Sequence, residues 1–378
     1  MLDKRKNRGE LKPYLANRDV RWGHCNVSDL SLMRFTEADQ AKFDLRPGDL
    51  LVCEGGEVGR TAIWNGELAD CYYQKAVHRL RSKRPLEPRF VLHYMKWAAD
   101  RQLFARLTSA TSIAHLTKEK LARAPLPLPP LPEQRRIAAI LDKADAIRRK
   151  RRQAIELTEE LLRSAFLEMF GDPVTNPKGW PVVELGELIA EIKAGWSAKG
   201  EDRPYGPSEH GVLKVSAVTS GWYRASEHKA VSDAAISKEL VVPRRGDLLF
   251  SRANTRDLVA AACIVIEPDP KTFLPDKLWR ITTDENRLRP EVLLYTLRHP
   301  RYRREITKKA TGTSGSMLNV SQKKVREAPT LLPPAHLQER FSRLFWRAVD
   351  QRSRAIRAAE QADDLFHSLA QRAFRGEF

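Results

Sequence analysis

Hydrophobic residues recur every three or four positions in two long stretches of the chain. In the first stretch these positions are Ile137, Leu141, Ala144, Ile155, Leu162, Ala165 and Met169. In the second they are Phe341, Phe345, Ala348, Ala355, Ala359, Phe366, Leu369 and Ala373. Alternating spacings of three and four are typical of a coiled-coil seam. Pro132 suits the first turn of a helix, and Gly171 followed by Pro173 ends one. The pattern predicts two long helices, the first from about residue 134 to 169.

Short apolar runs between Pro and Gly residues precede each long helix. The runs at 50–54, 261–267 and 278–282 predict strands, and the segments at 89–104 and 290–305 have helical periodicity. We therefore expect an α+β protein: two mixed α/β modules in tandem, each followed by a long helix. The two helices are expected to form an antiparallel coiled coil.

The chain contains an internal repeat. The Gly-Asp-Leu-Leu motif that begins at Gly48 recurs at Gly246, an offset of 198 residues. Residues 115–137 match 319–341 at an offset of 204, and the match includes a proline cluster and the glutamine Gln134. Two spaced matches in the same order indicate a tandem duplication. The predicted segments are a first module at 1–130, a first long helix at 131–171, a second module at 172–332 and a second long helix at 333–378.

The charge of the chain favours a polyanionic partner. Among 378 residues there are 66 Lys and Arg against 48 Asp and Glu, a formal net charge of +18, and 42% of the residues are hydrophobic. This hydrophobic content is too high for a disordered chain, and such a basic balance makes nucleic acid the first candidate partner. No run approaches the roughly 18 apolar residues of a membrane span, and the N-terminus has no apolar signal region. We expect a cytoplasmic protein.

Several signals of enzyme chemistry are weak. Residues 55–61 resemble a phosphate-binding loop, but the spacing is one residue short and Arg60 stands where lysine is required. Asp49 and Asp247 recur in equivalent Gly-Asp turns, which favours a structural role over metal binding. Neither the histidines nor the cysteines have the spacing of metal ligands, so we expect no metal site and no catalytic residue. The cysteines are expected to be reduced and buried: Cys25, Cys53, Cys71 and Cys263.

Candidate DNA contacts combine cations, aromatic rings and amides, because Arg, Lys, Asn and Gln read base edges and phosphates. In the first module they are Lys4, Arg5, Lys6, Arg8, Arg21, Trp22, Arg60, Tyr73, Gln74 and Lys75. In the second module they are Lys214, Ser216, Arg252, Asn254, Thr255, Arg256, Ser314 and Ser316.

The long helices carry two further features. Arg148 and Lys150 match Arg352 and Arg354 at the offset of 204. These cations are either a solvated helix face or phosphate contacts along a duplex. Apolar positions that lie off the seam are candidates for docking a partner helix: Ile140, Ile147, Leu344 and Leu365.

Three segments carry a family resemblance: RPGDLLVCEGGEVGR at 46–60, the proline-flanked run and helix at 125–172, and GWPVVELGEL at 179–188. They resemble the specificity subunit of Type I restriction-modification systems. The resemblance implies two target-recognition domains that each read one half of a bipartite, asymmetric duplex DNA site. It also implies a non-catalytic subunit that directs other subunits to that site.

The resemblance further implies partners and their cofactors. Two methyltransferase subunits and restriction-translocase subunits assemble on such a chain, which itself binds no cofactor. S-adenosylmethionine belongs to the methyltransferase, and ATP with Mg²⁺ to the restriction subunit. The counterpart of residues 179–195 in the first copy falls before Met1, so we expect the first recognition domain to be truncated at its start.

Two other functions remain open at this point. One is a self-sufficient nuclease or methyltransferase, which turnover by the isolated chain would reveal. The other is a basic coiled-coil scaffold for RNA or acidic proteins, which competition between duplex DNA and RNA would separate from a DNA reader.

Overall fold

The computed structural model describes residues 8–104, 115–308, 310 and 317–377. The chain forms two compact units. Unit 1 comprises residues 1–152 and 356–378, and unit 2 comprises residues 153–355. The boundary between the units therefore divides both long helices, whereas the sequence pattern assigned each helix to a segment of its own.

Besides its parts of the two long helices, the described residues of unit 1 form two small sheets and three shorter helices. One sheet has the order β2 (Ser31–Phe35), β1 (Glu10–Leu15) and β5 (Tyr72–Tyr73). The other has the order β4 (Thr61–Ile63), β3 (Leu50–Cys53) and β6 (Val77–Leu80). The helices are α1 (Glu37–Lys42), α2 (Pro88–Asp100) and α3 (Lys118–Ala122).

Unit 2 repeats this arrangement with additional strands. Its larger sheet has the order β13 (Ala262–Ile264), β11 (Leu248–Ser251), β15 (Leu278–Thr283) and β8 (Ile189–Ala194). A second sheet has the order β10 (His228–Ser232), β9 (Glu209–Leu213) and β14 (Thr272–Phe273). Two strand pairs join β12 (Ala253–Asn254) to β16 (Leu318–Asn319) and β17 (Pro329–Leu331) to β7 (Val182–Glu184). The helices are η2 (Leu185–Glu187), α5 (Ser216–Thr219), η3 (Asp233–Ala235), α6 (Pro290–Arg298), α7 (Pro300–Thr307) and α8 (Gln322–Arg326).

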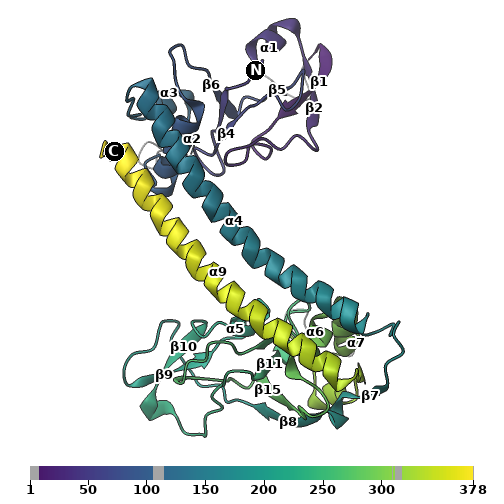
Figure 1. Cartoon of the computed structure of the whole chain (residues 1–378). Helices are drawn as coiled ribbons and strands as arrows, with labels where there is room; N and C mark the ends of the chain where they lie inside the picture. The colour runs from purple at the N-terminus through teal and green to yellow at the C-terminus, as the bar shows by residue number, and fades with distance from the viewer. Residues whose placement is uncertain (1–7, 105–114, 309, 311–316, 378) are drawn as a thin grey trace. The chain divides into compact units, whose positions relative to one another are not determined.

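The two long helices are α4 (Leu131–Phe170) and α9 (Ala335–Arg375), each continuous in Figure 1. In unit 1 the first half of α4 packs against the second half of α9, where Leu141 and Phe366 share one core. In unit 2 the second half of α4 packs against the first half of α9 through Phe166 and Phe341. The helices are therefore antiparallel within each unit. This arrangement confirms the predicted fold class. Each of the two α/β modules is followed by a long helix, and the two long helices pack together.

The repeated Gly-Asp motif forms the same turn in both units. The φ angles of Gly48 and Gly246 are +91° and +93°, a conformation that favours glycine. The carboxylate of Asp49 accepts the backbone N–H of Arg46 at 2.8 Å, and that of Asp247 accepts the equivalent N–H at 2.7 Å. The predicted structural role of these two aspartates is confirmed.

A buried glutamine in the first turn of each long helix joins that helix to its module. Gln134 and Gln338 are 3% and 2% exposed. The side-chain oxygen of Gln134 accepts the N–H of Glu87 at 3.1 Å, and that of Gln338 accepts the N–H of Arg289 at 2.9 Å. Each side-chain nitrogen donates at 2.8 Å to a carbonyl of the proline cluster. The glutamine thus satisfies backbone groups at the start of α2 or α6 that the helix itself leaves unpaired.

We expect Gln338→Ala to lower the free energy of unfolding of unit 2 by about 2–3 kcal/mol, because the buried backbone groups that this side chain satisfies lose their partner. Urea unfolding of the full chain measures the effect. Gln351→Ala on the exposed face of α9 is the matched control and should change stability by less than about 0.5 kcal/mol. Equal effects of the two substitutions would contradict the role of Gln338 in joining α9 to the module of unit 2.

The four cysteines are buried and free, as expected. Burial raises the pKa of Cys25, Cys71 and Cys263 to about 12 in each case, so these thiols stay protonated at neutral pH. Among the helices within the described ranges, none is both long and apolar enough to span a bilayer.

Candidate nucleic-acid interface

Five of the predicted DNA contacts lie outside the residues that the structure describes: Lys4, Arg5, Lys6, Ser314 and Ser316. The others divide into side chains that are held by neighbouring protein groups and side chains that project into solvent. This division separates residues that shape the surface from residues that can contact DNA.

In unit 1, Arg60 and Trp22 brace the loop that follows β3. The guanidinium of Arg60 donates to the carbonyl of Asn17 at 2.6 Å and pairs with Glu57 at 3.2 Å. The indole N–H of Trp22 donates to the same Glu57 carboxylate at 2.5 Å, and the ammonium of Lys96 lies 4.9 Å from the indole ring. Both predicted contacts are therefore engaged within the protein, and Glu57, which the sequence analysis did not select, organises them.

The remaining candidates of unit 1 differ in exposure. Tyr73 is 8% exposed on β5, and its ring meets the edge of Phe43. Gln74 is half-buried, whereas Lys75, Arg21 and Arg8 are exposed. Tyr73 therefore belongs to the core of the module, and the three exposed cations are available to phosphate or base edges.

In unit 2, Lys214 and Ser216 share one carboxylate. The ammonium of Lys214 lies 3.3 Å from Glu227 and 3.2 Å from Asp202, and the hydroxyl of Ser216 donates to Glu227 at 2.7 Å. Hydrogen bonds from Ser216 and Lys214 lower the pKa of Glu227 below its ordinary value, so this carboxylate stays ionised at neutral pH. The charge of Lys214 is thus already compensated.

The loop after β11 presents the strongest group of candidates. Arg252 donates to the carbonyl of Asp276 at 2.9 Å and pairs with its carboxylate at 3.3 Å. Asn254 lies on β12, and its buried side-chain nitrogen has no hydrogen-bond partner in the described part of the chain. Thr255 and Arg256 follow and are exposed. Arg252 fixes the start of the loop, and the next residues project from it.

The two loops occupy equivalent positions in the repeat. The N–H of Leu116 donates to the carbonyl of Glu54 at 2.8 Å in unit 1, and the N–H of Val320 donates to the carbonyl of Arg252 at 2.9 Å in unit 2. The same backbone frame therefore carries acidic side chains in one copy and basic side chains in the other. Aligning the two loops at the offset of 198 residues would have revealed this difference from the sequence.

On the long helices, two of the four predicted phosphate contacts take part in packing. Arg148 is 7% exposed, donates to Asp363 at 2.6 Å and lies 4.3 Å from the ring centroid of Phe366. Arg352 is half-buried and lies 3.9 Å from the ring centroid of Trp222. Lys150 and Arg354 are exposed. We therefore assign Arg148 and Arg352 to packing and keep Lys150 and Arg354 as candidate phosphate ligands.

The pairing of Arg148 predicts a pH dependence of stability. Burial tends to raise the pKa of Asp363, but hydrogen bonds from Arg148 and Arg152 hold it below its ordinary value of 3.8 overall. Because the folded-state pKa of Asp363 is lowered, its ionised carboxylate stabilises unit 1 above about pH 4. This contribution is lost as the pH falls through the folded-state pKa. Asp363→Asn should remove this part of the acid dependence in urea titrations between about pH 2 and 5, whereas Asp364→Asn at the neighbouring exposed position should not.

The four candidates for partner docking also differ in exposure. Ile147 and Leu365 are 47% and 52% exposed. Ile140 and Leu344 are half-buried, and Leu344 packs against the core of unit 2. Large apolar side chains with such exposure on a helix are suited to contact another protein.

Comparisons with known proteins agree with these features. Residues 3–157 match the family model for the Type I restriction modification DNA specificity domain. The Type I restriction enzyme EcoKI specificity subunit of Escherichia coli strain K12 is 24% identical over 328 residues, which cover 82% of this chain and 69% of that protein. Over most of its length the chain is similar to DNA specificity subunits of Type I restriction-modification systems.

Two further comparisons show the same similarity. The EcoEI specificity subunit of Escherichia coli is 29% identical over 194 residues, which cover 50% of this chain but only 32% of that subunit. A chain in a solved structure, described as showing complex assembly and conformational transition of the type I R-M system, matches the fold with a TM-score of 0.56 at 19% identity. That match covers 100% of this chain and 94% of the other.

Proposed function

We propose that this specificity subunit reads a bipartite, asymmetric site in duplex DNA, one half with each module. The observation that carries the proposal is the repeated loop frame with different side chains: Glu54 and Glu57 in unit 1 stand where Arg252 and Thr255 stand in unit 2. The exposed Arg256 of unit 2, whose guanidinium can donate to guanine, has Val58 as its counterpart in unit 1 at the offset of 198 residues. Equivalent loops with opposite charge are suited to different half-sites.

We propose that the exposed candidates make the DNA contacts. Arg8, Arg21 and Lys75 extend from unit 1, and Thr255 and Arg256 from unit 2. Lys150 and Arg354 would add phosphate contacts that carry no sequence information. Arg60, Lys214 and Arg252 would act indirectly, because their bonds to protein groups hold the loops in position.

We propose that the chain acts without catalytic residues, as the subunit that directs two methyltransferase subunits and the restriction-translocase subunits to DNA. S-adenosylmethionine, ATP and Mg²⁺ would belong to those partners. Ile147 and Leu365 are the side chains proposed to contact a methyltransferase helix. The functional domains would follow the boundaries 1–130, 131–171, 172–332 and 333–378.

Methylation mapping tests the proposed function. DNA from cells that carry this chain with a cognate methyltransferase should contain a bipartite methylated motif, and DNA from cells that lack only this chain should not. Absence of a motif despite folded chain and assembled methyltransferase would refute the proposal. Equal affinity for RNA and duplex DNA at the same salt concentration would instead favour the scaffold function.

A further inference from the structure

The loop between β12 and β13 in unit 2 carries two of the proposed DNA contacts, Thr255 and Arg256, and both are exposed. The end of the loop is buried, because Val259 and Ala260 are 0% and 1% exposed. The N–H groups of Leu258 and Val259 donate to the carbonyl of Thr255 at 3.0 and 2.8 Å, so the exposed part forms a tight turn. The position of the exposed side chains therefore depends on what holds this turn.

The turn ends in an unfavourable backbone conformation. Ala260 has a φ of +63°, in the left-handed region that residues with a Cβ atom rarely adopt. Its N–H donates to the carbonyl of Ser251 at 2.8 Å, and the N–H of Ser251 donates to the carbonyl of Ala261 at 2.8 Å. A strained conformation of this kind persists only where the surrounding structure holds it, and such residues are frequent at functional sites.

Arg303 on α7 supplies contacts that hold the turn. Its Nε donates to the carbonyl of Val259 at 2.9 Å, and its Nη2 donates to the carbonyl of Asp257 at 2.8 Å. One planar guanidinium thus binds two carbonyls of the same turn. Burial lowers the pKa of Arg303 below its ordinary value, but a guanidinium stays protonated at neutral pH. The positive charge strengthens both hydrogen bonds.

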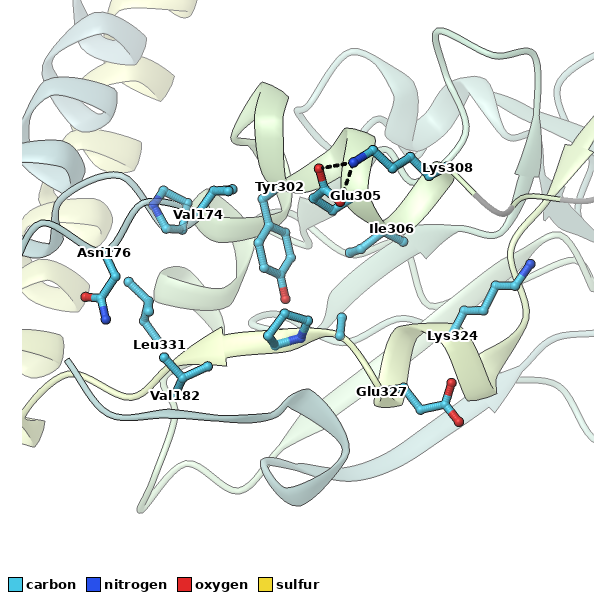
Figure 2. Close-up of a pocket in the computed structure, with 13 residues that line it drawn as sticks. Val174, Asn176, Val182, Tyr302, Glu305, Ile306, Lys308, Lys324, Glu327 and Leu331 are labelled. Carbon is cyan, nitrogen blue, oxygen red and sulfur yellow. Dashed lines mark hydrogen bonds and ion pairs between the residues drawn. The ribbon is translucent and has the colours of Figure 1, made fainter. Parts of the chain in front are cut away.

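Helix α7 is itself fixed in the core of unit 2. Tyr302 and Ile306 lie one turn apart on this helix and are both buried. The hydroxyl of Tyr302 lies 2.6 Å from that of Thr330 on β17, and Figure 2 shows Tyr302 pointing from α7 toward this strand. Arg303 therefore extends to the loop from a rigid support.

Unit 1 holds its equivalent loop in another way. There the cation lies within the loop itself: Arg60 donates to a carbonyl elsewhere in the module at 2.6 Å. The N–H of Cys53 donates to the carbonyl of Arg60, as the N–H of Ser251 does to the carbonyl of Ala261. Ala261 thus stands where unit 1 has Arg60, and its methyl group cannot donate a hydrogen bond. In unit 2 the guanidinium comes from α7 instead.

We propose that Arg303 is a positioning residue for DNA recognition, which fixes the turn that presents Thr255 and Arg256 and so sets the base preference of unit 2. The inference rests on the proposed function of this unit. Arg303 acts through the loop and not through a contact of its own with DNA. A side chain outside the loop therefore contributes to the choice of bases.

Hydrogen exchange of the full chain tests the hold on the loop without DNA. In Arg303→Met, the amides of Leu258 and Val259 should exchange at least about tenfold faster, because the turn loses two hydrogen bonds. Arg304→Met is the matched control, because the exposed guanidinium of Arg304 donates to Pro300 of its own helix at 3.3 Å. It should change exchange in the loop by less than about twofold. Exchange in α6 should stay unchanged in both variants. Unchanged exchange of the loop in Arg303→Met overturns the proposal.

Methylation by the full chain with its cognate methyltransferase tests the effect on base preference. On duplexes that vary one half of the motif at a time, Arg303→Met should lose at least about tenfold in discrimination at the half read by unit 2. Discrimination at the other half should change by less than about twofold. Arg303→Lys should lose as much as Arg303→Met, because an ammonium keeps the charge but lacks the planar fork that binds both carbonyls. Full discrimination by Arg303→Lys would mean that Arg303 acts through its charge on a DNA phosphate, which overturns the proposal.

Failure of this inference can be told apart from failure of the proposed function. A bipartite motif that Arg303→Met leaves unchanged in both halves overturns the role of Arg303 alone. Absence of any motif with the unsubstituted chain, despite folded chain and assembled methyltransferase, refutes the proposed function, and the effect of Arg303 on base preference is refuted with it.

Discussion

Phe341→Ala is expected to lower the free energy of unfolding of unit 2 by about 3–5 kcal/mol. The side chain is fully buried, at 0% exposed. Its ring centroid lies 5.8 Å from that of Phe166, 5.5 Å from Phe170 and 5.4 Å from Tyr295. The substitution removes both the buried area and these edge contacts, and the rigid helix pair cannot close the space.

Urea unfolding of the full chain, followed by tryptophan fluorescence, measures this effect. Arg343→Ala, two residues further along α9 on its exposed face, is the matched control and should change stability by less than about 0.5 kcal/mol. Phe341 contacts α4 and α6 together, so the helix seam and the module should unfold in one transition. A loss below about 1 kcal/mol for Phe341→Ala would show that the seam contributes little to unit 2.

The long helices were predictable because each buries one narrow face. Ile137, Leu141 and Phe366 are all buried, as the spacing of three and four required. The predicted first helix, from about 134 to 169, is observed at Leu131–Phe170. It begins earlier because Pro132 fits the first turn, and Gly171 ends it with a φ of +80°.

The modules were harder to predict because their strands are short and pair over long distances. The run at 50–54 forms β3, but the run at 261–267 forms a strand only at Ala262–Ile264. The single helical segment expected at 290–305 consists of two helices, because the ring of Pro300 starts a new one. Strand β1 escaped detection because its buried and exposed residues do not alternate.

The DNA contacts, too, could be predicted only in part from the sequence. The sequence identified residue types that can contact DNA. Whether each side chain is free to do so depends on hydrogen-bond and ion-pair partners that lie far away along the chain. Arg148 pairs with Asp363, 215 residues away, and Trp22 pairs with Glu57, 35 residues away. Local pattern cannot reveal such pairs, whereas the internal repeat revealed the equivalent turns and glutamines because both copies are present in one sequence.

Arg256→Ala is expected to reduce methylation at the native motif by about 10–100-fold and to relax only one of its two halves. The side chain is exposed on the loop after β12, and no described residue pairs with it. A guanidinium that reads a guanine edge contributes roughly 1–3 kcal/mol of discrimination, which corresponds to this range. Methylation mapping in cells, together with binding to duplexes that vary one half at a time, measures both effects.

Two comparisons separate base reading from simple loss of charge. Arg244→Ala removes the same charge from an exposed turn of unit 2 and should lower affinity only slightly and equally for all sequences. Arg21→Ala in unit 1 should change the opposite half of the motif, because each module is proposed to read its own half-site. If Arg256→Ala weakens all duplexes equally, this side chain contacts phosphate. If it leaves methylation within about twofold, the loop after β12 does not read DNA, and the base contacts of unit 2 must come from another part of its surface.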